Sequence, residues 1–157
     1  MVEVKLPSMN RHEIDSFIKE QMLCRIAFKG DDYPYMAPFQ YVFLNNSFYF
    51  HFTDYGKKIK LLEQDKRVCV EIESYRPDLS EYKFVVLRGS LKIVKNSNER
   101  KDAIEKMAEI GKERISKNFL SAHGLRKDEG WDSLRYDKPL TIMKLEDIVE
   151  VVGLKSF

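Results

Sequence analysis

The sequence predicts a single domain of the mainly β class, an antiparallel six-stranded barrel with peripheral α-helices. Three features predict it: six stretches with strand character, turn residues between most of them, and prolines that interrupt one strand. Strands joined by hairpins form an antiparallel sheet, and a sheet of that size with proline-interrupted strands usually closes into a barrel. The 157 residues fit one domain, covering 1–157, that can bury a core without a disulfide or metal.

The first expected elements are a helix and a short apolar strand. The helix begins near Asn10, because Asn10 and Glu13 have the spacing of a capping box. Apolar residues then recur on one face of that helix. The strand covers residues 23–28, and Arg25 is a misfit there because it is the only charged residue.

A second strand is expected over residues 33–44, where Pro34 and Pro38 interrupt the pattern. Proline cannot donate a hydrogen bond to a neighbouring strand, so this strand is an edge or carries a bulge. Asn45 and Asn46 predict a tight hairpin turn. The turn leads into the aromatic strand 48–52.

The most informative stretch follows that aromatic strand. On the strand, His51 shares a face with Tyr49 and Thr53, opposite the phenylalanines. A turn ending at Gly56 then leads into a helix that opens with two lysines, Lys57 and Lys58. Cations are unfavourable at a helix N-terminus, whose free N–H groups already present positive charge. The pair indicates either an anion site, typically for phosphate, or a solvated charged face.

The next part of the chain alternates between strands and helices. Residues 67–73 read as a half-buried strand, and a longer strand covers 82–94 with Gly89 as a bulge or bend. Asn96 opens an amphipathic helix that is expected to end at Gly111. A second helical segment is expected over residues 113–122.

The last part of the chain is less regular. Residues 123–138 are polar and irregular, although they carry the only tryptophan, Trp131. A final strand is expected over residues 140–145, with 148–154 continuing or returning.

Composition excludes several classes of protein. A net charge of +2, from 27 basic and 25 acidic residues, argues against an extended nucleic-acid interface. No signal peptide and no membrane-spanning apolar run is present, so we expect a cytoplasmic protein that does not engage a membrane. Cys24 and Cys69 read as buried free thiols. His12, His51 and His123 lack ligand spacing, so we predict no metal site.

Residues 14–93 resemble the FMN-binding split barrels, the superfamily of pyridoxamine 5′-phosphate oxidase. The resemblance rests on the order of the helix, the strand 23–28, the segments 35–41 and 48–53, Gly56-Lys57-Lys58 and the segment 62–70. The short branch that includes the nitroimidazole-resistance (Nim) proteins looks closest, because its members often show a histidine in the third strand and Gly-Lys-Lys after it. The resemblance implies a split β-barrel of Greek-key type that binds FMN. The C-terminal substrate-binding segment of true pyridoxamine-phosphate oxidases has no match here.

The resemblance also implies which residues hold the cofactor. Lys57, Lys58 and Arg25 fall where the family binds the FMN phosphate. The ribityl group and flavin edge would be lined by the main chain of Ile26, Ala27, His51 and Phe52 and by the Thr53 hydroxyl. Met36 and Pro38 would approach the ring. Trp131 either plugs the core or covers the flavin of a partner subunit.

Two classes of function follow from this pattern. The first is an FMN-dependent oxidoreductase that reduces a small nitro compound, quinone or similar acceptor, with NAD(P)H as electron donor. No pattern of a general base or nucleophile is present, so His51, the candidate catalytic residue, is expected to tune or orient. The second is a non-catalytic module: flavin storage or sensing, a barrel that binds haem or a deazaflavin, or one that stacks single-stranded nucleic acid. Abundant aromatic residues and the interrupted strand predict a homodimer with the flavin at its interface.

Overall fold

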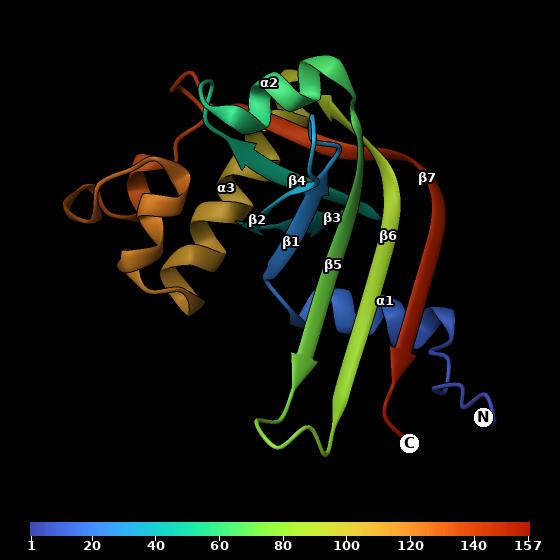
Figure 1. Ribbon diagram of the computed structural model, residues 1–157. Helices are drawn as coiled ribbons and strands as arrows, with labels where there is room; N and C mark the ends of the chain where they lie inside the picture. Colours follow the sequence, from blue (N-terminus) through green and yellow to red (C-terminus); the bar gives the residue numbers. More distant parts are fainter.

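The computed structural model describes residues 1–157 and contains one antiparallel sheet of seven strands (Figure 1). The order of strands across the sheet is β2-β1-β5-β6-β7-β4-β3. Their bounds are β1 Leu23–Phe28, β2 Tyr35–Gln40, β3 Val42–Leu44, β4 Ser47–Phe52, β5 Arg67–Tyr75, β6 Tyr82–Ile93 and β7 Thr141–Lys155. The mainly β class is confirmed, whereas the count of six strands is wrong by one.

The extra strand arises because the expected strand 33–44 divides at Tyr41. Its first part, β2, is one edge of the sheet, and its second part, β3, is the opposite edge. Since only Tyr41 lies between the two strands, the sheet must curl until its edges adjoin. The edges do not pair with each other, and this is where the barrel is split. The expectation that the proline-containing strand lies at an edge is confirmed for β2.

Three α-helices and three short 3₁₀ segments complete the chain. Their bounds are α1 Arg11–Glu20, α2 Lys57–Gln64, α3 Ser97–Arg114, η1 Lys117–His123, η2 Lys127–Glu129 and η3 Trp131–Ser133. The capping box of Asn10 and Glu13 is confirmed by hydrogen bonds in both directions. Asn96 caps α3 through the backbone N–H of Glu99 as expected.

The predicted end of the third helix at Gly111 is wrong. The helix continues to Arg114, and Gly111 lies within it against the indole of Trp131. A Cβ atom at Gly111 would overlap Cε3 and Cδ2 of that ring, so glycine is required here for close packing rather than for helix termination. The segment expected to be helical over 113–122 is instead the end of α3 followed by η1.

The later strands largely match expectation. Gly89 marks a register shift between β6 and β7, as its bulge assignment predicted. Of the two courses considered for the last strand, β7 takes the continuous one and runs from Thr141 to Lys155. The asparagine turn between β3 and β4 is confirmed, with positive φ at both Asn45 and Asn46.

The barrel interior is filled by apolar side chains from every strand except β3, together with α1 and α2. Aromatic rings cross the split, since Phe39 of β2 stacks on Phe52 of β4 with centroids 4.7 Å apart. In Figure 1, α2 lies over one end of the sheet and α1 beside the other end. The aromatic contacts hold β2 near β4 although no backbone pairing joins them.

A second core lies outside the barrel, where α3 and the 3₁₀ segments cover β3, β4 and the start of β7 (Figure 1). Alternate side chains of β4 pack in different cores. Phe50 points into the barrel, and Tyr49 points toward α3. Arg100 of α3 ties the segment before β7 to this layer, because its guanidinium donates to the carbonyls of Tyr136, Lys138 and Leu140.

Neither α1, α2 nor α3 is long and apolar enough to cross a lipid bilayer.

The contact between Gly111 and Trp131 makes a test of the second core. In an open helix interior, Gly→Ala stabilises by roughly 1 kcal/mol. Here we expect Gly111→Ala to lower the free energy of unfolding by about 1–3 kcal/mol, because the added methyl group overlaps the indole. Urea denaturation measures the change. In a Trp131→Leu background the same substitution should lose its penalty, and an equal penalty in both backgrounds would contradict the proposed clash.

Candidate functional site

The register of β1 and β2 brings several predicted cofactor residues side by side. Arg25 lies opposite Pro38, and Ala27 lies opposite Met36. These four side chains share the outer surface of the sheet, where Met36 is 62% exposed. Ile26 lies between them with its side chain wholly inside the barrel. Only the main chain of Ile26 is therefore available to a ligand on the outer surface.

Lys57 and Lys58 begin α2 as predicted, after Gly56. Gly56 has φ of 98°, a left-handed value that favours glycine, and no side chain caps the helix. The lysine ammonium groups rest on aromatic rings of β2, with Lys57 Nζ 5.3 Å from the centroid of Tyr35 and Lys58 Nζ 5.0 Å from that of Phe39. Two cations thus lie beside unsatisfied helix N–H groups, with no acidic residue in the first turn.

Arg25 is placed differently. Its guanidinium donates to Glu71 at 3.3 Å and to Glu73 at 2.5 Å, both on the neighbouring strand β5. The pKa of Glu71 is raised, mainly because the carboxylate is partly buried and secondly because of the charge of Glu73. The structure therefore brings the two lysines together over β2 and leaves Arg25 with the carboxylates of β5. A phosphate site shared by all three cations stays a prediction.

His51 lies on the outer side of β4 under the second core, and its ring is buried. Its Nδ1 lies 3.1 Å from Nδ1 of His123, which comes from η1. Nε2 of His123 lies 2.8 Å from Oε1 of Gln40, and Nε2 of Gln40 donates to the carbonyl of Met107 at 3.1 Å. Four groups from β4, η1, β2 and α3 thus form one continuous hydrogen-bonded chain.

Burial shifts both imidazoles in the same direction. It lowers the pKa of His51 to about 4. It also lowers the pKa of His123, with a smaller contribution from His51, to about 3. Both rings are therefore neutral at pH 7.

Sequence reasoning missed Gln40 and His123 as members of this site. His123 was placed in an irregular segment, and Gln40 was an unremarkable strand residue. They are 83 positions apart in sequence, so no local pattern connects them. The one available signal was Gln40, a polar residue between Phe39 and Tyr41.

Thr53 and Trp131 both lie near His123 and its neighbour Gly124. The Thr53 hydroxyl donates to the carbonyl of Tyr55 at 3.1 Å, and its methyl group lies against Gly124 at the end of η1. Trp131 is 3% exposed, stands edge-on to His123, and donates from Nε1 to the carbonyl of Ile115. Of its two expected roles, the single chain shows the core-filling one, and flavin covering stays a prediction. Phe52 points into the barrel, so only its main chain faces this site.

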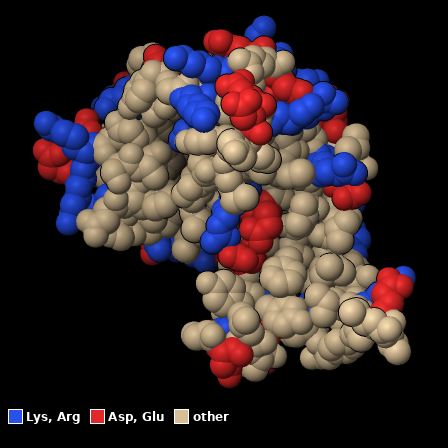
Figure 2. Space-filling model, viewed as in Figure 1, with Lys and Arg blue, Asp and Glu red and all other residues tan.

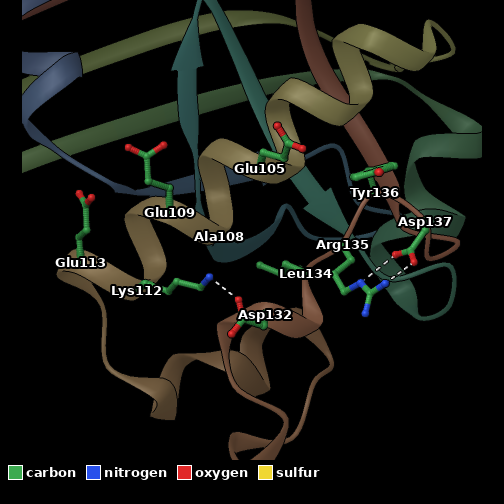
Figure 3. Close-up of a pocket in the computed structure, with 10 residues that line it drawn as sticks. All are labelled: Glu105, Ala108, Glu109, Lys112, Glu113, Asp132, Leu134, Arg135, Tyr136 and Asp137. Atoms are coloured by element: carbon green, nitrogen blue, oxygen red, sulfur yellow. Dashed lines mark hydrogen bonds and ion pairs between the residues drawn. The ribbon is translucent and has the colours of Figure 1, made fainter.

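Two hollows lie near this layer. One of about 220 Å³ has Gln40 in its wall together with Leu23 of β1 and Phe119 of η1. A larger one of about 630 Å³ lies on the far side of α3, against the chain that follows η3 (Figure 3). Its lining is charged and already paired in part, by Lys112 with Asp132 and by Arg135 with Asp137. Neither of these hollows is lined by a predicted cofactor residue, and only the smaller one includes a member of the hydrogen-bonded chain, Gln40. We therefore place the candidate site by the lysine pair and by that chain.

The comparison with protein families gives one match. The family described as pyridoxamine 5′-phosphate oxidase matches residues 10–131. No curated protein matches the chain significantly.

Solved structures share the fold at low sequence identity. A FAD-binding protein from Mesorhizobium loti is 19% identical with a TM-score of 0.70, over 98% of this chain and 100% of that one. A putative 5-nitroimidazole antibiotic resistance protein from Bacteroides thetaiotaomicron is 16% identical with a TM-score of 0.65, over 96% and 87%. The haem storage protein HutZ from Vibrio cholerae is 14% identical with a TM-score of 0.65, over 94% and 95%. At these identities the likeness establishes the fold alone.

The lowered pKa values of His51 and His123 predict a specific loss of stability in mild acid. Unfolded histidine binds a proton below its ordinary pKa of about 6.5, whereas folded His51 does not until about pH 4 and folded His123 not until about pH 3. Stability is therefore fully present above about pH 6.5 and falls as the pH drops toward 4. By pH 5 the loss should reach roughly 2 kcal/mol for each ring.

Urea denaturation at pH 7 and pH 5 measures this loss. The double variant His51→Gln/His123→Gln should show a shallower pH dependence than the wild type, because glutamine does not titrate. His12→Gln is the matched control, since His12 is exposed. Equal pH dependence in the wild type and the double variant would rule out buried neutral rings.

Proposed function

The chain belongs to the pyridoxamine 5′-phosphate oxidase family, and on that premise we propose that it binds FMN and reduces a small organic acceptor. The observation that carries the flavin proposal is the start of α2. Lys57 and Lys58 sit at an uncapped helix N-terminus with aromatic rings, rather than carboxylates, beneath their ammonium groups. A phosphate dianion satisfies the free N–H groups and both cations at once.

Arg25 contributes less to this proposed phosphate site than the lysines do. Its charge is already balanced by Glu71 and Glu73. A phosphate would have to displace two carboxylates to recruit it. The lysine pair has no such competitor and carries the proposal alone.

The surroundings of the lysines suit a flat, partly apolar ligand. Met36, Pro38 and Ala27 form an apolar strip on the outer side of β1 and β2. Thr53 and the main chain of His51 lie at the end of β4, beside the turn that leads to α2. In the proposed mode these groups bind and orient the ring while the lysines hold the phosphate. The bound flavin supplies the electron-transfer chemistry, with NAD(P)H as the proposed donor.

A non-catalytic flavin store or sensor would use the same binding residues. FAD-binding and haem storage proteins are both among the structures that share the fold. Two measurements separate these alternatives. The absorption spectrum of the purified protein distinguishes flavin from haem, and steady NAD(P)H consumption with a nitro compound or quinone distinguishes turnover from storage.

We also propose that two copies of the chain associate through the outer surface of β1, β5, β6 and β7. No helix covers this side of the sheet (Figure 1). Its middle is largely uncharged in Figure 2, apart from one group of mixed charge. On β1 and β5, Arg25 pairs with Glu71 and Glu73. Val86 and Val152 lie opposite each other on this surface. A second copy would cover apolar side chains that a single chain leaves in water.

Removing both lysines tests the phosphate site. We expect Lys57→Ala/Lys58→Ala to weaken FMN binding at least about ten-fold, because each charge-assisted contact contributes roughly 1.5–3 kcal/mol. Fluorescence titration with FMN and with riboflavin isolates the phosphate, since riboflavin binding should change little. Lys60→Ala, on the exposed side of the same helix, is the control. FMN and riboflavin weakened equally would place the phosphate elsewhere.

Light scattering tests the assembly. The wild type should have twice the mass of the chain, and Val152→Arg should be monomeric with unchanged circular dichroism, because the buried charge opposes association. Ile93→Arg is the control, since Ile93 is 57% exposed at the end of β6 and lines a hollow beside Ile59 and Leu62 of α2 rather than the outer surface. A monomeric wild type saturated with FMN would refute the proposed dimer.

A further inference from the structure

The hydrogen-bonded chain from α3 to His51 has a fixed direction. It begins at the carbonyl of Met107, which can only accept a hydrogen bond. The side-chain nitrogen of Gln40 must therefore face that carbonyl, which leaves Oε1 of Gln40 facing His123. One backbone oxygen thus sets the orientation of the Gln40 amide.

The orientation of the Gln40 amide determines which nitrogen carries the proton in each imidazole. Because Oε1 of Gln40 accepts, Nε2 of His123 must carry a proton and donate at 2.8 Å. A neutral imidazole has one N–H, so Nδ1 of His123 is an acceptor. Nδ1 of His51, 3.1 Å away, must then carry the proton that donates to it. The proton of neutral His51 is thereby assigned to Nδ1, and its Nε2 has a free lone pair.

Both rings are neutral at pH 7, as these proton positions require. The ring of His123 stands edge-on to Phe119 and Trp131, His51 stacks on His123, and burial is the largest cause of each lowered pKa. The only charge effect on either ring is the small contribution of His51 to His123.

The free nitrogen of His51 is not sealed completely in the interior. No fully buried side-chain nitrogen or oxygen in the structure lacks a hydrogen-bond partner. Nε2 of His51 has no partner, since the only hydrogen bond of this side chain is through Nδ1. That nitrogen is therefore not fully enclosed, although the ring as a whole is 7% exposed.

We propose that Gln40 and His123 are positioning residues that fix His51 as its Nδ1–H tautomer, so that this site takes a ligand group that donates an N–H or O–H hydrogen bond. The inference goes beyond the proposed function, in which only the main chain of His51 faces the flavin. Oxidised acceptors such as quinones and nitro compounds offer oxygen lone pairs alone, so neutral His51 does not bind them through Nε2. A phenolic O–H, a hydroxylamine or a ring imide N–H fits this nitrogen.

The tautomer is measured directly by ¹⁵N NMR of the histidine side chains in the full-length protein at pH 7. We expect the proton on Nδ1 in His51 and on Nε2 in His123. Gln40→Met removes the acceptor and should release His51 to a mixture of tautomers. His123→Gln should retain Nδ1–H in His51, because the amide oxygen can accept in place of the imidazole, whereas His123→Leu should lose it. A proton on Nε2 of wild-type His51 would overturn the proposal.

The ligand class is tested with phenol and anisole, which differ in the O–H donor. Phenol should shift the ¹⁵N resonance of His51 Nε2 and bind at least about three-fold more tightly than anisole. His51→Gln should lower this preference if Nε2 is the acceptor. Equal affinity of the two probes for the wild type would refute the ligand class. Both experiments use protein without added FMN, so their outcomes do not depend on whether the protein binds FMN.

Discussion

The passage of the chain from one edge of the sheet to the other through Tyr41 is the constraint on which the remaining structure depends. Strands β2 and β3 occupy opposite edges, yet one residue separates them. The edges must therefore adjoin, and the sheet must curl around a core. Tyr41 is 1% exposed and is held by its hydroxyl, which donates to the carbonyl of Ile18, and by its N–H, which donates to that of Met22. The junction is thus anchored to α1 and the chain leading into β1.

The curled sheet gives β4 two buried sides, and the candidate site is built on the second. One side fills the barrel with phenylalanine rings, and the other meets α3 and the 3₁₀ segments. A polar side chain on the second side cannot reach bulk water freely, so its hydrogen bonds have to be made within the protein. His51 meets this requirement at Nδ1, through His123 and Gln40. Close approach of η3 to α3 at Gly111 helps to hold this covering layer in place.

Of the basic residues near the site, one is paired with carboxylates and two are not. Arg25 is neutralised on the outer surface by two carboxylates of β5, while Lys57 and Lys58 lie on aromatic rings at the start of α2. The near-neutral net charge of the chain is compatible with a local basic site. Attraction of a polyanion over a long distance depends on the net charge, whereas binding of one phosphate depends on the few cations around it. Family membership establishes the fold and its superfamily. The choice of ligand within that superfamily depends on such local differences.

Features set by residues a few positions apart were determined by the sequence alone. These include the caps at Asn10 and Asn96, the turn at Asn45 and Asn46, and the two-sided pattern of β4. Each depends on local backbone geometry, which nearby side chains control directly. Only the tertiary structure decided where strand 33–44 divides, which carboxylates engage Arg25, and which groups meet His51. The partners of His51 and Arg25 lie tens of residues away, and curling of the sheet, rather than any local preference, brings them together.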